Sequence, residues 1–220
     1  MVVSRFNEYL FLFLMLIDNV QIGRDEAELI KMIIEDVRKV NPTHLNVPDR
    51  QVGLDRRVAK LNVLLNMEYN CVGIVAIWGM GGIGKTTIAK RLYNLIQYKF
   101  ERSGIKVIRK KAFGRKKVLV VLDDVYNDQQ LKALAIDRDS FAPGSRIIIT
   151  TRDKSSLKIL ELGENKIHGL EKLDEDESLE LFSWHAFKED HPPQDYLDLS
   201  RQIVHYAGGL PLALEVLGKA

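Results

Sequence analysis

The chain has 220 residues, of which 46% are hydrophobic and 28% charged, and its 32 basic and 30 acidic side chains give a net charge of +2. A chain of this length can bury a core without disulfides or a structural metal, and the single Cys71 could build neither. The near-neutral charge argues against a protein dedicated to coating nucleic acid or a membrane surface.

The N-terminus has an atypical apolar segment at residues 1–22. Tyr9–Ile17 are nine consecutive apolar residues, less than half of the roughly 20 that a membrane-spanning helix needs. We therefore expect no membrane span. A secretory signal fits the length, but Asp18–Ile22 offer no small-residue cleavage site.

Residues 23–50 follow as a predicted linker helix leading into a new domain. Its apolar residues recur three and four positions apart, as on one face of a helix: Ala27, Ile30, Ile33, Ile34 and Val37. Asn41 and Pro42 end the pattern, and the stretch to Arg50, with Pro42 and Pro48, is typical of a linker.

The next predicted element is a strand at residues 72–78, where VGIVAIW is typical of a strand buried on both faces of a parallel sheet. GMGGIGKTT follows at 79–87 and matches the pattern GxxxxGK(S/T). A helix is predicted from Lys85 onward because one apolar stripe continues along the chain, formed by Ile88, Leu92, Leu95 and Ile96.

This glycine-rich loop predicts a phosphate site. Glycines let successive backbone N–H groups point at phosphate oxygens, and the helix that follows adds its positive end. Lys85 is expected to reach the outer phosphates, and the Thr86 hydroxyl to bind Mg²⁺. The expected nucleotide contacts in the loop are Gly79, Gly81, Gly82, Ile83, Gly84, Lys85, Thr86 and Thr87.

Two later buried strands are predicted to end in polar residues. Val118–Leu122 precede Asp123 and Asp124. We expect Asp123 to hold Mg²⁺ through water and Asp124 to act as the catalytic residue that orients or activates a hydrolytic water. Ile147–Ile149 lead to Arg152, whose fork of donors suits a terminal phosphate.

Charge is uneven over the rest of the chain. Residues 102–117 carry eight Lys or Arg and no acid, and residues 161–198 carry twelve Asp or Glu against three Lys. We interpret both stretches as solvated surfaces. A nucleic-acid motor would need stacking aromatics, and the basic stretch offers only Phe113, so no nucleic-acid partner is expected.

Taken in order, these motifs resemble the nucleotide-binding module of plant intracellular immune receptors, the NB-ARC type of the STAND ATPases, in the subgroup that carries a TIR domain. Tyr126 departs from that subgroup, which has Asp or Trp there. The matching segments are Val52–Asp55 with Arg57, 79–87, 116–125, 144–153, 173–187 and 208–218.

The resemblance implies an α/β fold, with a parallel P-loop NTPase sheet flanked by helices at residues 51–155 and a small all-α, ARC1-like subdomain at 156–220. The motif at 208–211 also reads as a helix that ends and restarts. The resemblance further implies that Val52 and Gly53 help form the adenine pocket, that Arg152 senses the γ-phosphate, and that Pro211 packs near the nucleotide.

Such receptors are switches that exchange ADP for ATP and then oligomerise. The resemblance therefore implies ADP or ATP with Mg²⁺ as cofactors, other NB-ARC receptors as partners, and defence signalling as the role. It implies at most a slow ATPase, located in the cytoplasm, with the nucleus as a second location.

Three departures from the family pattern motivate a second hypothesis. Asp123 lies only 38 positions after Lys85, so an insert with an edge strand is expected to be missing between Glu101 and Gly104. The resemblance also implies a TIR domain before the module, and a winged-helix subdomain and leucine-rich repeats after it, and we expect none of these in the given sequence. The second hypothesis is a truncated, non-catalytic interactor or decoy of full-length receptors.

Overall fold

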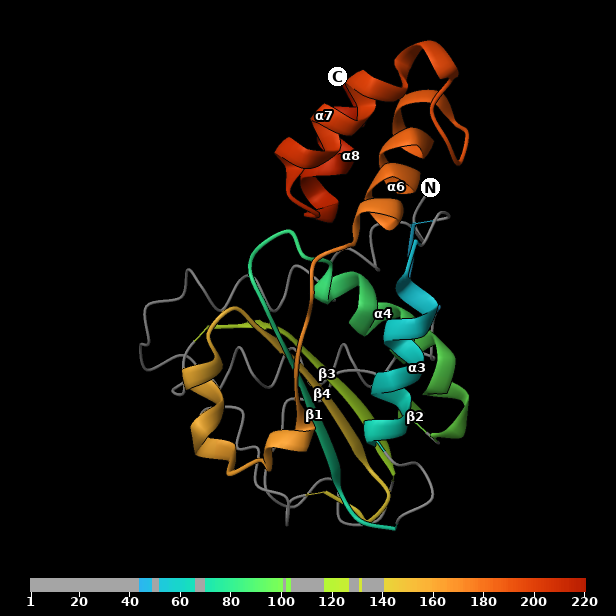
Figure 1. The fold of residues 1–220 in the computed structure, drawn as a ribbon. Helices are drawn as coiled ribbons and strands as arrows, with labels where there is room; N and C mark the ends of the chain where they lie inside the picture. Colours follow the sequence, from blue (N-terminus) through green and yellow to red (C-terminus); the bar gives the residue numbers. More distant parts are fainter. Residues whose placement is uncertain are drawn as a thin grey trace, which may run out of the picture.

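The protein is described by a computed structural model that covers residues 44–48, 52–65, 70–100, 102–103, 117–126, 131 and 141–220. The apolar segment 1–22 and the apolar stripe of the predicted linker helix lie outside these residues. So does the basic stretch, apart from Arg102, Ser103 and Lys117. Figure 1 shows a sheet with helices packed beside it and a group of helices above its upper end.

All strand pairs in the five-stranded sheet are parallel, in the order β2-β3-β4-β1-β5. The three predicted buried strands are present as β1 (Gly73–Trp78), β3 (Val118–Val125) and β4 (Arg146–Thr151). The carboxyl ends of these three strands lie together at the end of the sheet beneath the helical group (Figure 1). The predicted α/β fold class is confirmed.

The edge beside β3 carries β2 (Arg102–Ser103), which pairs with Val118 and Leu119 at the start of β3. This is the place where the sequence indicates a lost edge strand. Within the described residues, the structure therefore puts a two-residue strand at this position. The six later residues of β3 extend beyond that pairing.

Alternating side chains of the strands build a core on each face of the sheet. On one face, Val75 and Ile77 pack with helices α3 (Leu54–Leu65) and α4 (Lys85–Ile96). The predicted stripe of α4 is buried at Ile88, Leu92 and Ile96, whereas Leu95 is 46% exposed. A short 3₁₀ turn, η2 (Gln97–Lys99), follows α4.

On the opposite face, Ile74 and Ala76 pack with Leu157 of the 3₁₀ segment η4 (Lys154–Leu160). A second 3₁₀ turn, η5 (Glu164–Lys166), leads into β5 (Ile167–Gly169), which pairs with β1. The sheet therefore continues beyond the predicted subdomain boundary at 155/156. A three-residue strand with His168 at its centre has no apolar run by which the sequence could reveal it.

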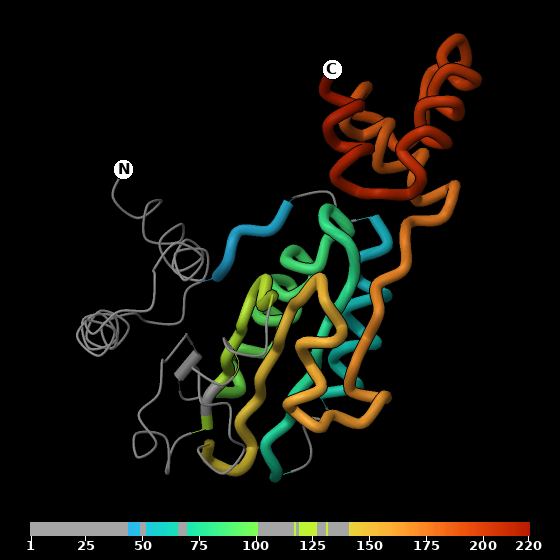
Figure 2. Tube along the Cα trace, turned by 90° about the vertical axis from the view of Figure 1, so that its left-hand side faces the viewer, coloured from blue at the N-terminus to red at the C-terminus, as the bar shows by residue number. Residues whose placement is uncertain are grey.

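The helical subdomain contains α6 (Glu175–Phe187), the 3₁₀ turn η6 (Gln194–Tyr196), α7 (Leu197–Ala207) and α8 (Pro211–Lys219). Its buried core is Leu181, Phe182, Val204 and Leu214. Gly208 ends α7 in the left-handed conformation and Pro211 occupies the first turn of α8, so the predicted helix break at 208–211 is present. Figure 2 shows these helices beyond the end of the sheet.

No helix in the described parts of the chain is both long and apolar enough to cross a bilayer.

Candidate functional site

The site begins at the glycine-rich loop that joins β1 to α4. Gly82 and Gly84 have φ angles of 75° and 93°, in the left-handed region that L side chains adopt at a cost. Gly84 is the N-cap of α4 and supplies no side-chain cap, and the first turn of the helix has no acidic residue. The positive end of α4 is thus left for an anion outside the helix.

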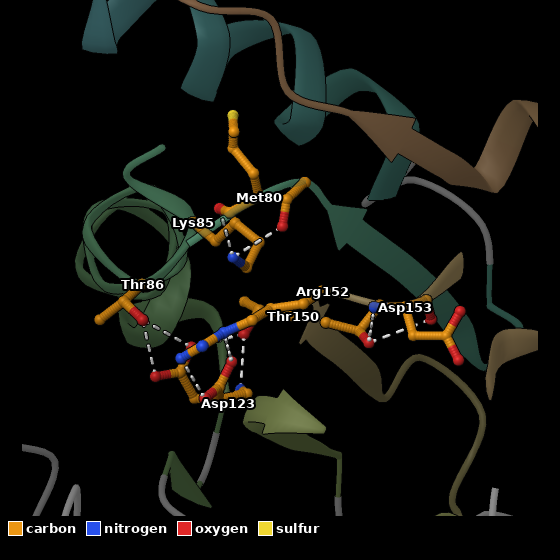
Figure 3. A network of polar contacts seen from close by, with 10 residues as sticks. Met80, Lys85, Thr86, Asp123, Thr150, Arg152 and Asp153 are labelled. Carbon is orange, nitrogen blue, oxygen red and sulfur yellow. Dashed lines mark hydrogen bonds and ion pairs between the residues drawn. The ribbon is translucent and has the colours of Figure 1, made fainter. Parts of the chain in front are cut away.

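Lys85 lies within this loop and is 7% exposed. Its ammonium donates to the main-chain carbonyls of Gly79 and Met80, both at 2.9 Å (Figure 3). Burial lowers the pKa of Lys85 below its ordinary value, while nearby Asp124 acts in the opposite direction. The carbonyls satisfy its hydrogen bonds but carry no net charge, so an incoming phosphate would stabilise the ammonium further.

Thr86 and Asp123 meet across the space between α4 and β3. The Thr86 hydroxyl lies 2.8 and 3.0 Å from the two carboxylate oxygens of Asp123. Thr150, at the end of β4, donates to Asp123 Oδ1 at 2.6 Å and is completely buried. Three elements distant in the sequence therefore place oxygen atoms at one point (Figure 3).

Asp124 stands beside this group with a φ of 52°, where β3 has a register irregularity between Leu122 and Val125. Its backbone N–H donates to the Thr150 hydroxyl at 2.8 Å. Its carboxylate accepts two hydrogen bonds from the Arg152 guanidinium, at 3.0 and 3.1 Å. The structure thus brings together the residues predicted to activate water and to sense the terminal phosphate.

The helical subdomain reaches the loop through α8. The N–H of Leu212 donates to the carbonyl of Gly82 at 3.2 Å. This N–H belongs to the first turn of a helix, where backbone donors have no partner within the helix. Pro211 directly precedes Leu212 at the start of α8, and its packing near the nucleotide stays a prediction.

Val52 and Gly53 form a turn before α3 and contact the same subdomain. Val52 packs on its core, and Gly53 has a φ of 64°. The structure puts this pair beside α6 rather than within the polar network of Figure 3.

The donors present fit Mg²⁺ bound together with a nucleotide. Mg²⁺ prefers oxygen ligands and in nucleotide sites takes one or two protein groups, with phosphate and water oxygens completing its shell. Thr86 and Asp123 supply a hydroxyl and a carboxylate within hydrogen-bond distance of each other. Such an ion would replace the hydroxyl proton as the positive partner of Asp123.

The family model of the NB-ARC domain matches residues 54–111 and 98–191, which together span more than half of the chain. This chain belongs to the NB-ARC domain family. Its module is therefore a nucleotide-binding one. The two matched segments overlap at residues 98–111, around the position where the sequence predicts a missing insert.

Curated plant proteins resemble most of the chain. TMV resistance protein N of Nicotiana glutinosa is 34% identical over 89% of this chain and 20% of its own length. Disease resistance protein RPV1 of Vitis rotundifolia is 35% identical over 89% of this chain and 17% of its own. The chain thus spans about a fifth of these relatives. The alignment with N runs over 238 residues, more than the 220 of the whole chain, so N has residues in this region that the chain lacks.

A solved structure with a similar fold is Cdc6p from Pyrobaculum aerophilum. Its TM-score is 0.53 at 15% identity, over 83% of this chain and 64% of that one. At this identity the likeness supports the fold alone.

Sequence reasoning assigned no role to Thr150, which forms hydrogen bonds with both Asp123 and Asp124. A threonine at the end of an apolar strand, two residues before Arg152, is the signal that could have indicated it. It also assigned no role to Glu177, whose partner Arg57 lies 120 positions away in the sequence. No local pattern reveals such a pair.

Proposed function

We propose that this chain binds ADP or ATP with Mg²⁺ and acts as the nucleotide switch module of a plant immune receptor. The observation that carries the proposal is the position of Lys85. A buried ammonium bonded to two main-chain carbonyls stands at the start of α4, next to the Thr86–Asp123 pair. Buried charges are costly unless they are paired, and a polyphosphate would pair this one.

In the proposed complex, backbone N–H groups of the loop from Gly79 to Gly84 and the Lys85 ammonium hold the phosphates. Thr86 and Asp123 hold the metal, which when bound would neutralise phosphate charge. Thr87 follows Thr86 in the first turn of α4 and extends the phosphate contacts. Val52, Gly53 and Pro211 would contact the base side of the nucleotide.

Arg152 and Asp124 give the proposed switch its sensitivity to the γ-phosphate. Their paired side chains are 64% and 39% exposed, so the ion pair contributes at most about 1 kcal/mol to stability and can open at small cost. Arg152 would then turn to the γ-phosphate and free the Asp124 carboxylate to orient water. Turnover is expected to be slow, because a switch must hold its state.

The test is the melting temperature of the whole chain with and without Mg-ADP. A ligand that binds only the folded state stabilises it, by about 2.7 kcal/mol at a concentration of 100 Kd. Lys85→Ala should abolish the shift, whereas Lys60→Ala, at an exposed lysine of α3, should retain it. Equal shifts in both variants, or none in the wild type, would contradict the proposal.

A second experiment concerns the distinction between the nucleotides. Arg152→Ala should weaken ATP binding more than ADP binding, as measured by isothermal titration, because only ATP offers a γ-phosphate. An equal effect on both would remove Arg152 as the sensor.

The second candidate is an interactor or decoy that pairs with full-length receptors without using a nucleotide. It is favoured by the two-residue β2 and by the residues of N that have no counterpart here. Capture of a full-length NB-ARC receptor that persists in Lys85→Ala would support it. Under either candidate we propose other NB-ARC receptors as partners and a cytoplasmic location, in keeping with the resemblance to intracellular receptors.

A further inference from the structure

A half-buried ion pair joins the nucleotide-binding part to the helical subdomain. The guanidinium of Arg57, on α3, donates to both carboxylate oxygens of Glu177, on α6, at 2.8 and 3.1 Å. The two side chains are only 13% and 15% exposed. Figure 1 shows the start of α3 beside the first turn of α6. A two-pronged Arg–carboxylate contact fixes orientation as well as distance.

The same guanidinium also fixes the turn before α3. It donates to the carbonyl of Gly53 at 2.8 Å and lies 3.4 Å from the carbonyl of Lys172, in the segment that leads to α6. Arg57 therefore holds the backbone of the proposed adenine segment and the entry to the helical subdomain with one planar group.

Glu177 is itself held in place by the start of α6. Its backbone N–H donates to the Asp174 side chain at 2.8 Å, and its carboxylate accepts from the Asp174 N–H at 3.3 Å, which closes a capping box. Hydrogen bonding to Arg57 lowers the pKa of Glu177, so the side chain is a carboxylate at neutral pH. The helix start thus presents a fixed anion to Arg57.

Gly53 shows how closely this pair approaches the turn. A Cβ atom placed there would lie 2.0 Å from Arg57 Nη1 and 2.2 Å from Glu177 Oε1. The residue before it, Val52, packs on the core of the helical subdomain. The Val52–Gly53 turn is therefore enclosed by the ion pair on one side and by the helical core on the other.

We propose that Arg57 and Glu177 are positioning residues that set the Val52–Gly53 turn for the base of the nucleotide and make that setting depend on the docked helical subdomain. This inference rests on the proposed function. Binding of the base then requires the docked helical subdomain, whereas the phosphates are held by the glycine loop and Lys85. Loss of the ion pair should weaken binding of the base and leave binding of the phosphates unchanged.

The experiment compares two ligands on the full chain: ADP, which has a base, and inorganic pyrophosphate, which does not. Arg57→Lys keeps the positive charge but loses the two-pronged fork. Glu177→Gln keeps an oxygen for the capping box but loses the charge. Arg56→Ala is the matched control, because Arg56 touches Glu177 from 3.6 Å with a side chain that is 75% exposed.

We expect Arg57→Lys and Glu177→Gln each to weaken ADP binding about tenfold, the effect of one charged hydrogen bond, with pyrophosphate binding unchanged. The double variant should be no weaker than either single one, and Arg56→Ala should match the wild type. If Arg57→Lys does not fold, the comparison of ADP and pyrophosphate binding by Glu177→Gln tests the inference alone.

Wild-type ADP affinity in the folded variants would overturn the inference while leaving the proposed function in place. A parallel loss of ADP and pyrophosphate would also overturn it, because the pair would then act on the whole fold. A wild-type chain that binds neither ligand would overturn both the proposed function and the inference.

Discussion

Thr150 holds both members of the acidic pair: its hydroxyl donates to Asp123 Oδ1 at 2.6 Å and accepts from the backbone N–H of Asp124 at 2.8 Å. The hydroxyl is completely buried. The orientation of Asp123, the proposed metal residue, and of Asp124, the proposed catalytic residue, thus depends on one side chain from the adjacent strand.

Thr150→Val should destabilise the protein by about 1–3 kcal/mol, because the partly buried N–H of Asp124 loses its hydroxyl partner. Urea unfolding would measure the loss. Thr150→Ser retains the hydroxyl and is expected to lose less of the unfolding free energy. Equal losses in the two variants would show that the methyl group, rather than the hydrogen bonds, matters at this position.

Gly82→Ala should lower the unfolding free energy by about 1–2 kcal/mol, since its φ of 75° is unfavourable for an L side chain. A Cβ there would also lie 3.0 Å from the Cβ of Leu212 on α8. Gly81→Ala is the control from the same loop, because its nearest neighbour would be Arg152 Nη1 at 3.8 Å. Thermal unfolding of both should show the larger loss at Gly82, and the reverse order would refute this reading of the loop.

Asp124→Asn and Asp124→Ala both remove the charge that binds Arg152, but only Asn readily adopts a positive φ. Because φ at this position is 52°, we expect the Ala variant to be less stable than the Asn variant by about 1 kcal/mol. Chemical denaturation of the two gives the difference directly. Identical stabilities would mean that the backbone at 124 relaxes when its carboxylate is removed.

Glu177 should make stability depend on pH under acidic conditions. Its pKa in the folded state lies below the ordinary value of 4.5, chiefly because Arg57 hydrogen-bonds to its carboxylate. Its contribution is therefore complete above pH 4.5 and is lost as the pH falls through the lower, folded-state pKa. The gap in unfolding free energy between wild type and Glu177→Gln should close over that acidic range.

The control for this pH profile is Glu175→Gln, at an exposed carboxylate in the same turn of α6. Glu175 lies in the first turn of the same helix but outside the Arg57 contact. If the difference in unfolding free energy between Glu175→Gln and the wild type also disappeared over that acidic range, the helix end rather than Arg57 would account for the pH dependence.

The parts of the fold that could be predicted are those with local signals. Continuous apolar runs indicated β1, β3 and β4, and the glycine motif indicated the start of α4. The same motifs predicted where Lys85, Thr86, Asp123 and Arg152 would gather, because parallel strands end at one edge of a sheet.

What could not be predicted depends on contacts across long stretches of chain. Arg146 is 1% exposed, which its residue type does not suggest; its guanidinium donates to the carbonyls of Cys71 and Ser145. Gly73, opposite Arg146, leaves the room this side chain needs. β5 is too short for a periodic pattern, and Arg57 and Glu177 meet only once both parts have folded.

The hydrogen bond from the Leu212 N–H to the Gly82 carbonyl makes one amide proton a local probe of the phosphate loop. Its rate of exchange with solvent deuterium follows the opening of that contact, and its chemical shift follows the orientation of the Gly82 peptide. A nucleotide that reshapes the loop would therefore be visible at α8, at a backbone atom that itself need not touch the ligand.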